Sequence, residues 1–357
     1  MKSNYETLGK YINLVDERNS DDKFETVLGI NIDKYYMPSV ANTIGTDLSK
    51  YKVVRKNRFA CNPMHVGRDE RLPVALFLNE VPGIVSPAYF TFDISDKNKL
   101  NPEYLMMWFR RKEFDRVCWL KTDGSVRGGL SWDDLCRMDI QIPSIEEQNE
   151  IVKAYNVVKD RIQLKQQIND NLEATAQAMY QEFFVDNSEI SKWKQGTVGD
   201  VLQLQRGHDL PRTEMLVGKY PVAGSTGTIG YHNQYTAEAP VIVMGRSGNI
   251  GNPRLYLCNC WTHNTSLYVK QIYQVEPMWA FYMLKNLNYD CFVGGSAVPT
   301  LNRNDVHAYG IAIPPLELQK RFTDYVMKLI LSKEANLSEI VKLQELQETI
   351  LTTMSSR

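Results

Sequence analysis

Apolar residues recur at alternating intervals of four and three residues along two long stretches of this chain. The first stretch follows Pro143, and the second follows Pro314 and Pro315. This spacing predicts two helices that each carry an apolar seam of the coiled-coil type. The predicted seam positions are Ile151, Tyr155, Val158, Ile162, Leu172, Ala176, Met179 and Phe183 in the first stretch, and Phe322, Val326, Leu329, Ile340, Leu343, Ile350 and Met354 in the second.

Polar residues occupy other positions of both seams. They are Lys165 and Asn169 in the first stretch, and Lys333, Asn336 and Gln347 in the second. Such residues either fix the register and orientation of paired helices at a cost in stability, or simply lie toward solvent, and both interpretations stay open. A helix of roughly 35 residues is about 50 Å long, so two of them packed together would form a rod that holds two globular parts apart.

The segments 1–142 and 187–313 have a different pattern. Short runs of β-branched and aromatic residues are broken by Gly and Asn, as in APVIVMGRSGNIGNPRLYL at 239–257. Such runs predict strands in two mixed α+β domains. The chain is therefore expected to consist of a domain at 1–142, a helix at 143–186, a second domain at 187–313 and a second helix at 314–357. The polar stretch 186–195 is the candidate linker into the second domain.

An internal repeat joins each domain to its helix. Residues 124–148 and 295–319 align without a gap at an offset of 171, and nine of the 25 aligned positions are identical. The correspondence continues along both seams. Near the start of each domain an offset of 190 aligns LGK at 8–10 with VGD at 198–200, so the first domain carries 19 more residues, which we expect in loops. Self-similarity of this kind indicates two copies of one structural unit, which we expect to contact two places on one partner.

Composition and charge limit the location and the partners. The 357 residues are 43% hydrophobic and 23% charged, which is typical of globular proteins. No apolar run approaches the roughly 18–20 residues of a membrane span, and the first residues lack the apolar core of a secretory signal. These features predict a cytoplasmic protein without membrane contact. The net charge is −1, with slightly basic domains and acidic or neutral helices. Because strong DNA binders usually show a clear basic excess, either DNA is not the ligand or another subunit supplies much of the phosphate-binding charge.

Motifs for catalysis and for metal binding are weak. Residues 62–65 (NPMH) resemble faintly a loop of amino-methyltransferases, but lack its second proline and its aromatic residue. The glycines at 245–251 fit neither the dinucleotide fingerprint nor the phosphate-binding loop. Cys258, Cys260 and His263 match no common zinc spacing, and buried cysteines on a strand explain them better. We therefore predict no catalytic residue, no metal site and no cofactor bound by this chain.

Basic and polar loops are the candidates for ligand contact. Glycine lets the backbone approach a ligand closely, and Arg, Asn and Tyr can read base edges or hold phosphates. The same loops are equally compatible with tight turns between strands. The candidate contacts are Arg55, Arg58, Asn62, Arg68, Arg71, Lys121 and Arg127 in the first domain, and Arg206, Arg212, Tyr231, Arg246, Arg254 and Arg303 in the second.

The pattern I-P-x-[LI]-E-x-Q occurs twice, each time where a domain meets its helix. The copies are IPSIEEQ at 142–148 and IPPLELQ at 313–319. Together with NPM at 62–64, SPAY at 86–89 and the glycine-rich segments 224–231 and 245–251, this arrangement resembles the specificity subunit (HsdS) of type I restriction–modification systems. The resemblance covers essentially the whole chain.

The resemblance implies a fold and a set of partners. The α+β fold would have two target-recognition domains separated by two long antiparallel helices, which form a coiled-coil spacer with pseudo-two-fold symmetry. Each domain would bind one half of a bipartite site in double-stranded DNA, and the spacer would set the gap. Two methyltransferase subunits and restriction/translocase subunits would carry S-adenosylmethionine, ATP and Mg, while this chain would catalyse nothing. The candidates for the spacer and partner interface are Ile151, Tyr155, Val158, Ile162, Leu172, Met179, Phe322, Val326, Leu329, Ile340, Leu343 and Ile350.

Two other hypotheses remain open at this point. The chain could be a coiled-coil scaffold that displays two β-rich domains for binding protein or carbohydrate. It could also serve another restriction class, or be a silent copy exchanged by recombination. Salt-dependent retention on DNA together with a methyltransferase subunit would distinguish the DNA hypotheses from the scaffold.

Overall fold

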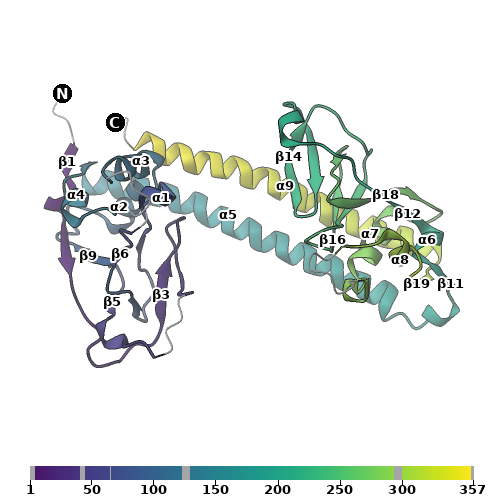
Figure 1. Ribbon diagram of the computed structural model, residues 1–357, viewed down its shortest axis with the longest axis horizontal. Coiled ribbons are helices and arrows are strands. Elements are labelled where there is room, and N and C mark those ends of the chain that lie inside the picture. Colours follow the sequence, from purple (N-terminus) through teal and green to yellow (C-terminus); the bar gives the residue numbers. More distant parts are fainter. Residues whose placement is uncertain (1–4, 41–44, 65, 123–128, 293–299, 355–357) are drawn as a thin grey trace. The chain divides into compact units, whose positions relative to one another are not determined.

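The computed structural model describes residues 5–40, 45–64, 66–122, 129–292 and 300–354. The chain divides into two compact units, one formed by Met1–Leu164 with Glu339–Arg357 and the other by Lys165–Ser338. Each unit contains one domain and parts of both long helices (Figure 1). No helix in these described stretches is long and apolar enough to cross a membrane.

Two four-stranded sheets build the domain of the first unit. One is antiparallel, with the order β2-β9-β6-β7, and the other has the order β4-β3-β8-β5, in which β3 and β8 are parallel. The pair β1 and β10 joins the beginning of the domain to its end. The strands are β1 (Tyr5–Thr7), β2 (Ile12–Val15), β3 (Val27–Ile30), β4 (Tyr36–Pro38), β5 (Lys52–Val54), β6 (Phe59–Cys61), β7 (Val74–Leu76), β8 (Gly83–Val85), β9 (Phe90–Ile94) and β10 (Asp139–Gln141).

Aromatic side chains form the centre of this domain. Phe59 of β6 stacks on Phe92 of β9 with ring centroids 5.0 Å apart, and Phe109 meets Phe59 edge-on at 5.7 Å. Phe109 ends a helix that begins with Pro102, where a proline fits because the first N–H of a helix has no partner. The helices are α1 (Val66–Asp69), α2 (Pro102–Phe109), α3 (Lys112–Leu120) and α4 (Trp132–Cys136).

The second unit repeats this topology. The pair β11 and β19 corresponds to β1 and β10, and the sheet β12-β18-β15-β16 corresponds to β2-β9-β6-β7. A sheet of order β14-β13-β17, with β13 and β17 parallel, corresponds to β4-β3-β8. The strands are β11 (Lys194–Thr197), β12 (Leu202–Arg206), β13 (Tyr220–Gly224), β14 (Gly227–His232), β15 (Val241–Gly245), β16 (Gly251–Tyr256), β17 (Trp261–Thr262), β18 (Ser266–Ile272) and β19 (Gly310–Ile313).

The helices of this domain are α6 (Val198–Val201), α7 (Pro277–Lys285) and α8 (Arg303–His307). The extra residues of the first domain were expected in loops, and this expectation is only partly right. Strand β5 and helix α1 have no counterpart among the elements of the second unit that the structure describes. The expected linker 186–195 is too long, because β11 begins at Lys194 and Trp193 is buried against Phe184 with ring centroids 6.3 Å apart.

Helices α5 (Ile145–Tyr180) and α9 (Leu316–Thr353) run antiparallel to each other within each unit. In the first unit Val158 and Ile162 are buried against Ile340. In the second unit Phe322 is fully buried, and its ring centroid lies 5.0 Å from that of Phe184 in the π-helical turn that follows α5. The predicted α+β fold with two long paired helices is therefore confirmed.

The polar seam residues of the second unit face one another. Lys165 Nζ donates to Asn336 Oδ1 at 2.8 Å, and Asn336 Nδ2 donates to Asn169 Oδ1 at 2.9 Å. One turn further, Glu173 forms an ion pair with Lys333 at 2.7 Å and another with Lys285 of α7. Burial would raise the pKa of Glu173, but the hydrogen bonds from the two lysines hold this pKa below its usual value. These residues therefore fix the register of the helices, as the first of the two interpretations expected.

A fully buried glutamine ties α5 to the first domain. The backbone N–H of Asn101 donates to Gln148 Oε1 at 2.9 Å. The Gln148 amide nitrogen donates to the carbonyl oxygens of Lys99 at 2.8 Å and of Pro143 at 2.9 Å. Asn101 is the N-cap of α2, so one amide group links the start of α5 to the start of α2.

Gln319 makes the same connection in the second unit. Its Oε1 accepts from the N–H of Glu276, the N-cap of α7, at 2.8 Å, and its Nε2 donates to Pro314 O at 2.8 Å. A glutamine is needed because only a neutral amide offers an acceptor and donors on one side chain of this length. The last residue of each repeated I-P-x-x-E-x-Q segment is therefore a structural link between a domain and its helix.

We expect Gln319→Leu to lower the free energy of unfolding by about 2–4 kcal/mol, because the Glu276 N–H and the Pro314 carbonyl oxygen would both lose their partner in a buried site. Denaturant unfolding measures this change. The control is Gln167→Leu on the exposed face of α5. Equal unfolding free energies for the two variants would contradict the assigned role of Gln319.

His307 at the end of α8 holds this helix to the sheet. Its Nε2 accepts from the backbone N–H of Leu204 in β12 at 2.8 Å, which requires an unprotonated Nε2. Burial lowers the pKa of His307, and the nearby charge of Arg303 lowers it further. The folded protein therefore keeps this imidazole neutral at a pH where the unfolded chain begins to bind a proton.

We expect the second domain to lose stability as the pH falls below about 6.5, because the unfolded state then binds a proton at His307 that the folded state excludes. His307→Gln keeps an acceptor for the Leu204 N–H and removes the titration. Thermal unfolding of both proteins between about pH 7.5 and pH 5 should show a smaller loss for the variant. An identical pH dependence would contradict the assignment.

Candidate nucleic-acid interface

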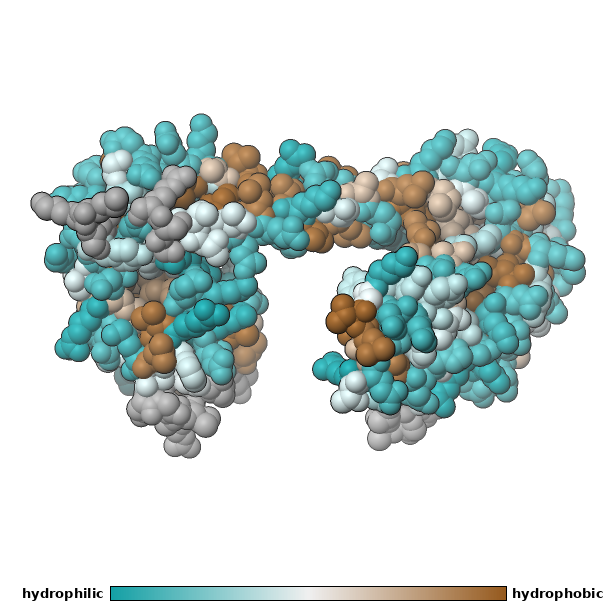
Figure 2. All heavy atoms as spheres, turned by 90° about the horizontal axis from the view of Figure 1, so that it is seen from above, coloured by the Kyte–Doolittle hydropathy of each residue, from teal (hydrophilic) through white to brown (hydrophobic). Residues whose placement is uncertain are grey.

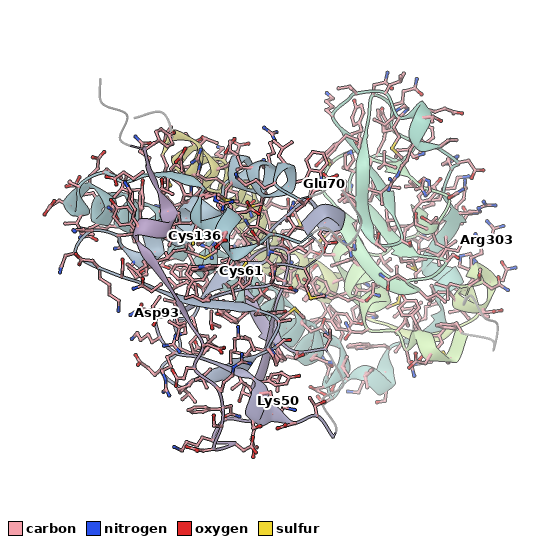
Figure 3. All side chains as sticks on the ribbon, turned by 60° about the vertical axis from the view of Figure 1, so that its left-hand side comes forward. Lys50, Cys61, Glu70, Asp93, Cys136 and Arg303 are labelled. Atoms are coloured by element: carbon pink, nitrogen blue, oxygen red, sulfur yellow. The ribbon has the colours of Figure 1, made fainter. Side chains whose placement is uncertain are left out.

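Three of the predicted contacts meet in one pocket of the second domain. Arg206 ends β12, Arg246 directly follows β15, and Arg303 is the first residue of α8. The pocket has a volume of about 430 Å³, and its wall is completed by Leu267, Thr300, Leu301 and Asn302. Arg303 lies on the outside of this domain, where its side chain is exposed (Figure 3).

Backbone hydrogen bonds place the arginines around this pocket. The buried Leu301 donates its N–H to Arg246 O at 2.8 Å, and the side chain of Asn302 caps α8 by accepting from the Asn304 N–H at 3.0 Å. Asp209 is the nearest acid to Arg206, at 3.8 Å, and both side chains are exposed. Among the described residues, Arg246 and Arg303 form no ion pair. This arginine pocket, formed by Arg206, Arg246 and Arg303, therefore offers positive charge to an anionic or hydrogen-bond-accepting ligand.

The equivalent place in the first domain has different chemistry. The Leu130 N–H donates to Pro63 O at 3.0 Å, which corresponds to the bond between Leu301 and Arg246 in the second domain. Trp132 aligns with Arg303 at the offset of 171 and packs edge-on against Phe90 with ring centroids 5.8 Å apart. The predicted contacts did not include Trp132, although aligning the two repeats would have found it.

Two predicted contacts of the first domain are held by carboxylates. Arg58 donates to Asp93 through Nε at 3.0 Å and to Glu17 through Nη1 at 2.7 Å, and only 11% of its side chain is exposed. Arg55 forms a second ion pair with Glu17, from the more exposed side. The hydrogen bonds from Arg55 and Arg58 hold the pKa of Glu17 below its usual value, so the carboxylate stays charged. Arg58 therefore stabilises the domain through its ion pairs. Arg55 contributes one ion pair to the same cluster.

The other predicted contacts of this domain lie in surface segments. Asn62 Oδ1 accepts from the Met64 N–H at 3.1 Å, which shapes the turn after β6. Arg71 forms an exposed ion pair with Asp33 at 2.9 Å. Lys121 is exposed at the end of α3. The side chain of Arg68 and the whole of Arg127 lie outside the described parts of the chain.

The structure separates the remaining predicted contacts from the arginine pocket. Tyr231 and Arg254 line a groove of about 960 Å³ within the second unit, together with Lys219 and residues of α7 and α9. Arg212 lies in a short 3₁₀ turn, Arg212–Glu214, and is exposed. The candidates of the second domain therefore fall into a compact group of three and a dispersed group.

The interpretation of Cys258 and Cys260 as buried cysteines on a strand is wrong for Cys258, which is exposed and follows the end of β16. Cys260 is buried, which raises the pKa of its thiol to about 12, so it stays protonated. His263 Nδ1 interacts with Thr265 Oγ1 at 3.0 Å. Within the residues described by the structure, no group of three or more His, Cys, Asp or Glu side chains is arranged to hold a metal ion.

The predicted spacer and partner interface residues lie mostly inside the units. In the first unit, the core or the helix seam contains Ile151, Tyr155, Val158, Ile162, Ile340, Leu343 and Ile350. In the second unit, the core contains Met179, Phe322, Val326 and Leu329, and Leu172 is half-buried. These side chains hold the helices and domains together.

Other apolar residues of the long helices are exposed, and they lie outside the predicted seam positions. They are Val157, Leu164, Val341 and Leu346 in the first unit, and Ile168, Leu316, Tyr325, Leu331 and Leu337 in the second. Figure 2 shows apolar surface along the helices. Exposed apolar residues gathered on a helix are typical of a surface that binds another protein.

Comparison with known proteins shows the family. Residues 75–174 and 190–346 match the family described as "Type I restriction modification DNA specificity domain". The MjaIX specificity subunit of Methanocaldococcus jannaschii is 23% identical over 302 residues, which cover 72% of this chain and 69% of that protein. The HindI specificity subunit of Haemophilus influenzae is 26% identical over 147 residues, which cover 40% of this chain and 31% of that protein.

A solved structure has the same fold. The S subunit of a type I restriction–modification system from M. genitalium superimposes with a TM-score of 0.63 and 15% sequence identity, covering 98% of this chain and 95% of that one. The sequence match to the family covers more than half of this chain, in two segments that each span parts of one domain and one long helix. This protein therefore belongs to the type I restriction–modification DNA specificity family.

Proposed function

We propose that this chain selects the DNA sequence on which a type I restriction–modification complex acts. Each domain reads one half of a bipartite site in double-stranded DNA, and the paired helices set the number of base pairs between the halves. The chain contributes recognition only. Methylation and cleavage belong to partner subunits, which hold S-adenosylmethionine, ATP and Mg.

This proposal rests on one observation: the two domains have the same backbone framework but carry different side chains at equivalent positions. The two domains repeat the same sheets, and Gln148 and Gln319 make the same junction with the helices. At one equivalent position, however, the first domain has Trp132, which is half-buried against Phe90 and Phe92, and the second has the exposed Arg303. A protein that recognises two unrelated half-sites needs such a constant framework, on which the residues that contact DNA can differ.

The residues at these positions suit the reading of base edges. Arginine pairs with the O6 and N7 atoms of guanine through two hydrogen bonds, and it binds phosphate oxygens equally well. An apolar side chain recognises the methyl group of thymine. We assign the arginine pocket to the half-site of the second domain, and the surface around Trp132 to the half-site of the first.

Partner subunits complete the proposed assembly. With a net charge of −1, this chain alone supplies little attraction for DNA. We infer that two methyltransferase subunits contribute phosphate contacts and dock on the exposed apolar residues of α5 and α9, and that restriction/translocase subunits join them. Family membership supports DNA as the ligand over the scaffold hypothesis with protein or carbohydrate.

We expect Arg246→Gln to weaken binding to the half-site of the second domain by about 1–3 kcal/mol, or roughly 5- to 150-fold, because a guanidinium that binds base edges would be lost. The measurement uses the chain with its methyltransferase subunit and DNA in which each half-site is altered in turn. Discrimination at the other half-site should stay unchanged.

Lys270→Gln is the control, because Lys270 is an exposed cation on β18 of the same domain and is not one of the candidate contacts. It should change affinity little. If Arg246→Gln weakened binding to every DNA equally and left discrimination at both half-sites intact, the arginine pocket would hold only phosphates, and its assignment to base reading would fail.

A further inference from the structure

The second unit contains an open groove of about 960 Å³. Residues of strands β14 and β16 and of helices α7 and α9 line it. Two of the predicted DNA contacts, Tyr231 and Arg254, belong to this lining and lie outside the arginine pocket. The DNA role proposed above therefore leaves the groove without a ligand.

The first unit fills the equivalent place with its own chain. Arg110 and Lys285 are equivalent, because each follows the first proline of α2 or α7 by eight residues. Arg110 lines a cavity of only about 130 Å³, together with Tyr35 and Tyr155. Its guanidinium lies over the ring of Tyr35, 5.0 Å from the centroid, and its Nη1 donates to the Tyr155 hydroxyl at 3.5 Å. An aromatic ring is thus held against a cation at this place.

The turn that supplies this ring is missing from the second unit. Residues 31–35 join β3 to β4, and Tyr35 is the last of them. Only Ser225 and Thr226 join β13 to β14, which form the corresponding hairpin. The shorter turn carries no tyrosine. The place beside Lys285 therefore remains open as part of the groove.

The sheet side of the groove carries positive charge that no carboxylate neutralises. Lys219 precedes β13, Arg254 lies in β16, and neither forms an ion pair among the residues that the structure describes. A Cβ at Gly227 would collide with Arg254 Nη1, so only a glycine leaves room for the guanidinium against the hairpin. On the helix side, by contrast, Glu173 pairs with both lysines of the lining. An acidic ligand would therefore be attracted to the sheet side.

The rest of the lining suits a protein segment better than a nucleic acid. Tyr231 is 60% exposed and Leu337 of α9 is 42% exposed, and Phe281 and Ile330 add apolar surface between them. Exposed aromatic and apolar residues gathered in a groove are typical of a site that binds a peptide or a helix. Glu334 of α9 is an exposed carboxylate in the same lining, and it would repel phosphates.

We propose that this groove binds a segment of another protein in which a tyrosine or phenylalanine is flanked by acidic residues. The ring would lie against the side chain of Lys285, as Tyr35 lies against Arg110 in the first unit, and cation–π attraction would hold it there. The acidic residues would accept charged hydrogen bonds from Arg254 and Lys219. The site does not depend on the DNA role proposed above.

The test selects a phage library of short random peptides on the whole chain, after depletion on the Tyr231→Ala variant. We expect enriched peptides that carry an aromatic residue next to Asp or Glu. As synthetic peptides they should bind the natural chain saturably in fluorescence anisotropy. Arg254→Glu should weaken this binding at least about tenfold, because repulsion replaces a charged hydrogen bond. Lys270→Glu, the same charge reversal on an exposed position of β18 outside the groove, should leave it unchanged.

A second pair of variants on α9 keeps the proposal testable if Arg254→Glu does not fold. Leu337→Glu places a carboxylate in the groove, so it should also weaken binding of the acidic peptides at least about tenfold. Leu331→Glu is the matched control, because Leu331 is equally exposed on α9 but does not line the groove. It should bind the peptides as the natural chain does.

The proposal is wrong if the selection enriches no peptide, or if the enriched peptides lack acidic residues. It is also wrong if Arg254→Glu and Leu337→Glu both leave peptide binding at full strength, because the peptides would then bind elsewhere on the molecule. If no peptide were enriched and Arg254→Glu instead weakened the binding of a DNA duplex, the groove would be a nucleic-acid site.

Discussion

The connection between each domain and its long helix depends on one buried amide group in the first turns of the helix. Gln148 and Gln319 each accept from the N–H of an N-cap residue in their domain and donate to the carbonyl oxygen of the proline that precedes the helix. Directional bonds in a dry site, rather than apolar contact alone, therefore determine how a helix leaves its domain. The loops that carry the candidate contacts take no part in this junction, so they can change without disturbing it.

The chemistry of the two units differs around this common junction. The second unit places Glu173 between Lys285 and Lys333 and holds its helices with a polar seam. The first unit uses apolar seam residues, and Tyr35 narrows the place where the second unit has an open groove. The two units therefore differ in the side chains that contact the long helices, and also in the side chains on their outer surfaces. The two halves are therefore equivalent in topology but not in the surfaces that they offer to DNA and to partner subunits.

The sequence predicted the parts of this structure that depend on local pattern. The two helices, their seams and the repeated junction follow from periodicity and from the offset of 171. Periodicity could not show that Arg58 is occupied, because Asp93 and Glu17 lie 35 and 41 residues away and meet it only after the sheets form. Trp132 aligns with Arg303, but it was not among the predicted contacts because it is neither basic nor part of a polar loop. The convergence of Arg206, Arg246 and Arg303 needed the strand order of the second domain.

In the proposed role, two domains on one frame read two separate parts of a DNA site. Sequencing of methylated bases in the genome of the host, with the gene intact and with it deleted, reveals that site. We expect a motif of two short sequences with a constant unread gap, methylated only when the gene is intact. A single continuous motif, or methylation that persists unchanged without the gene, would contradict it.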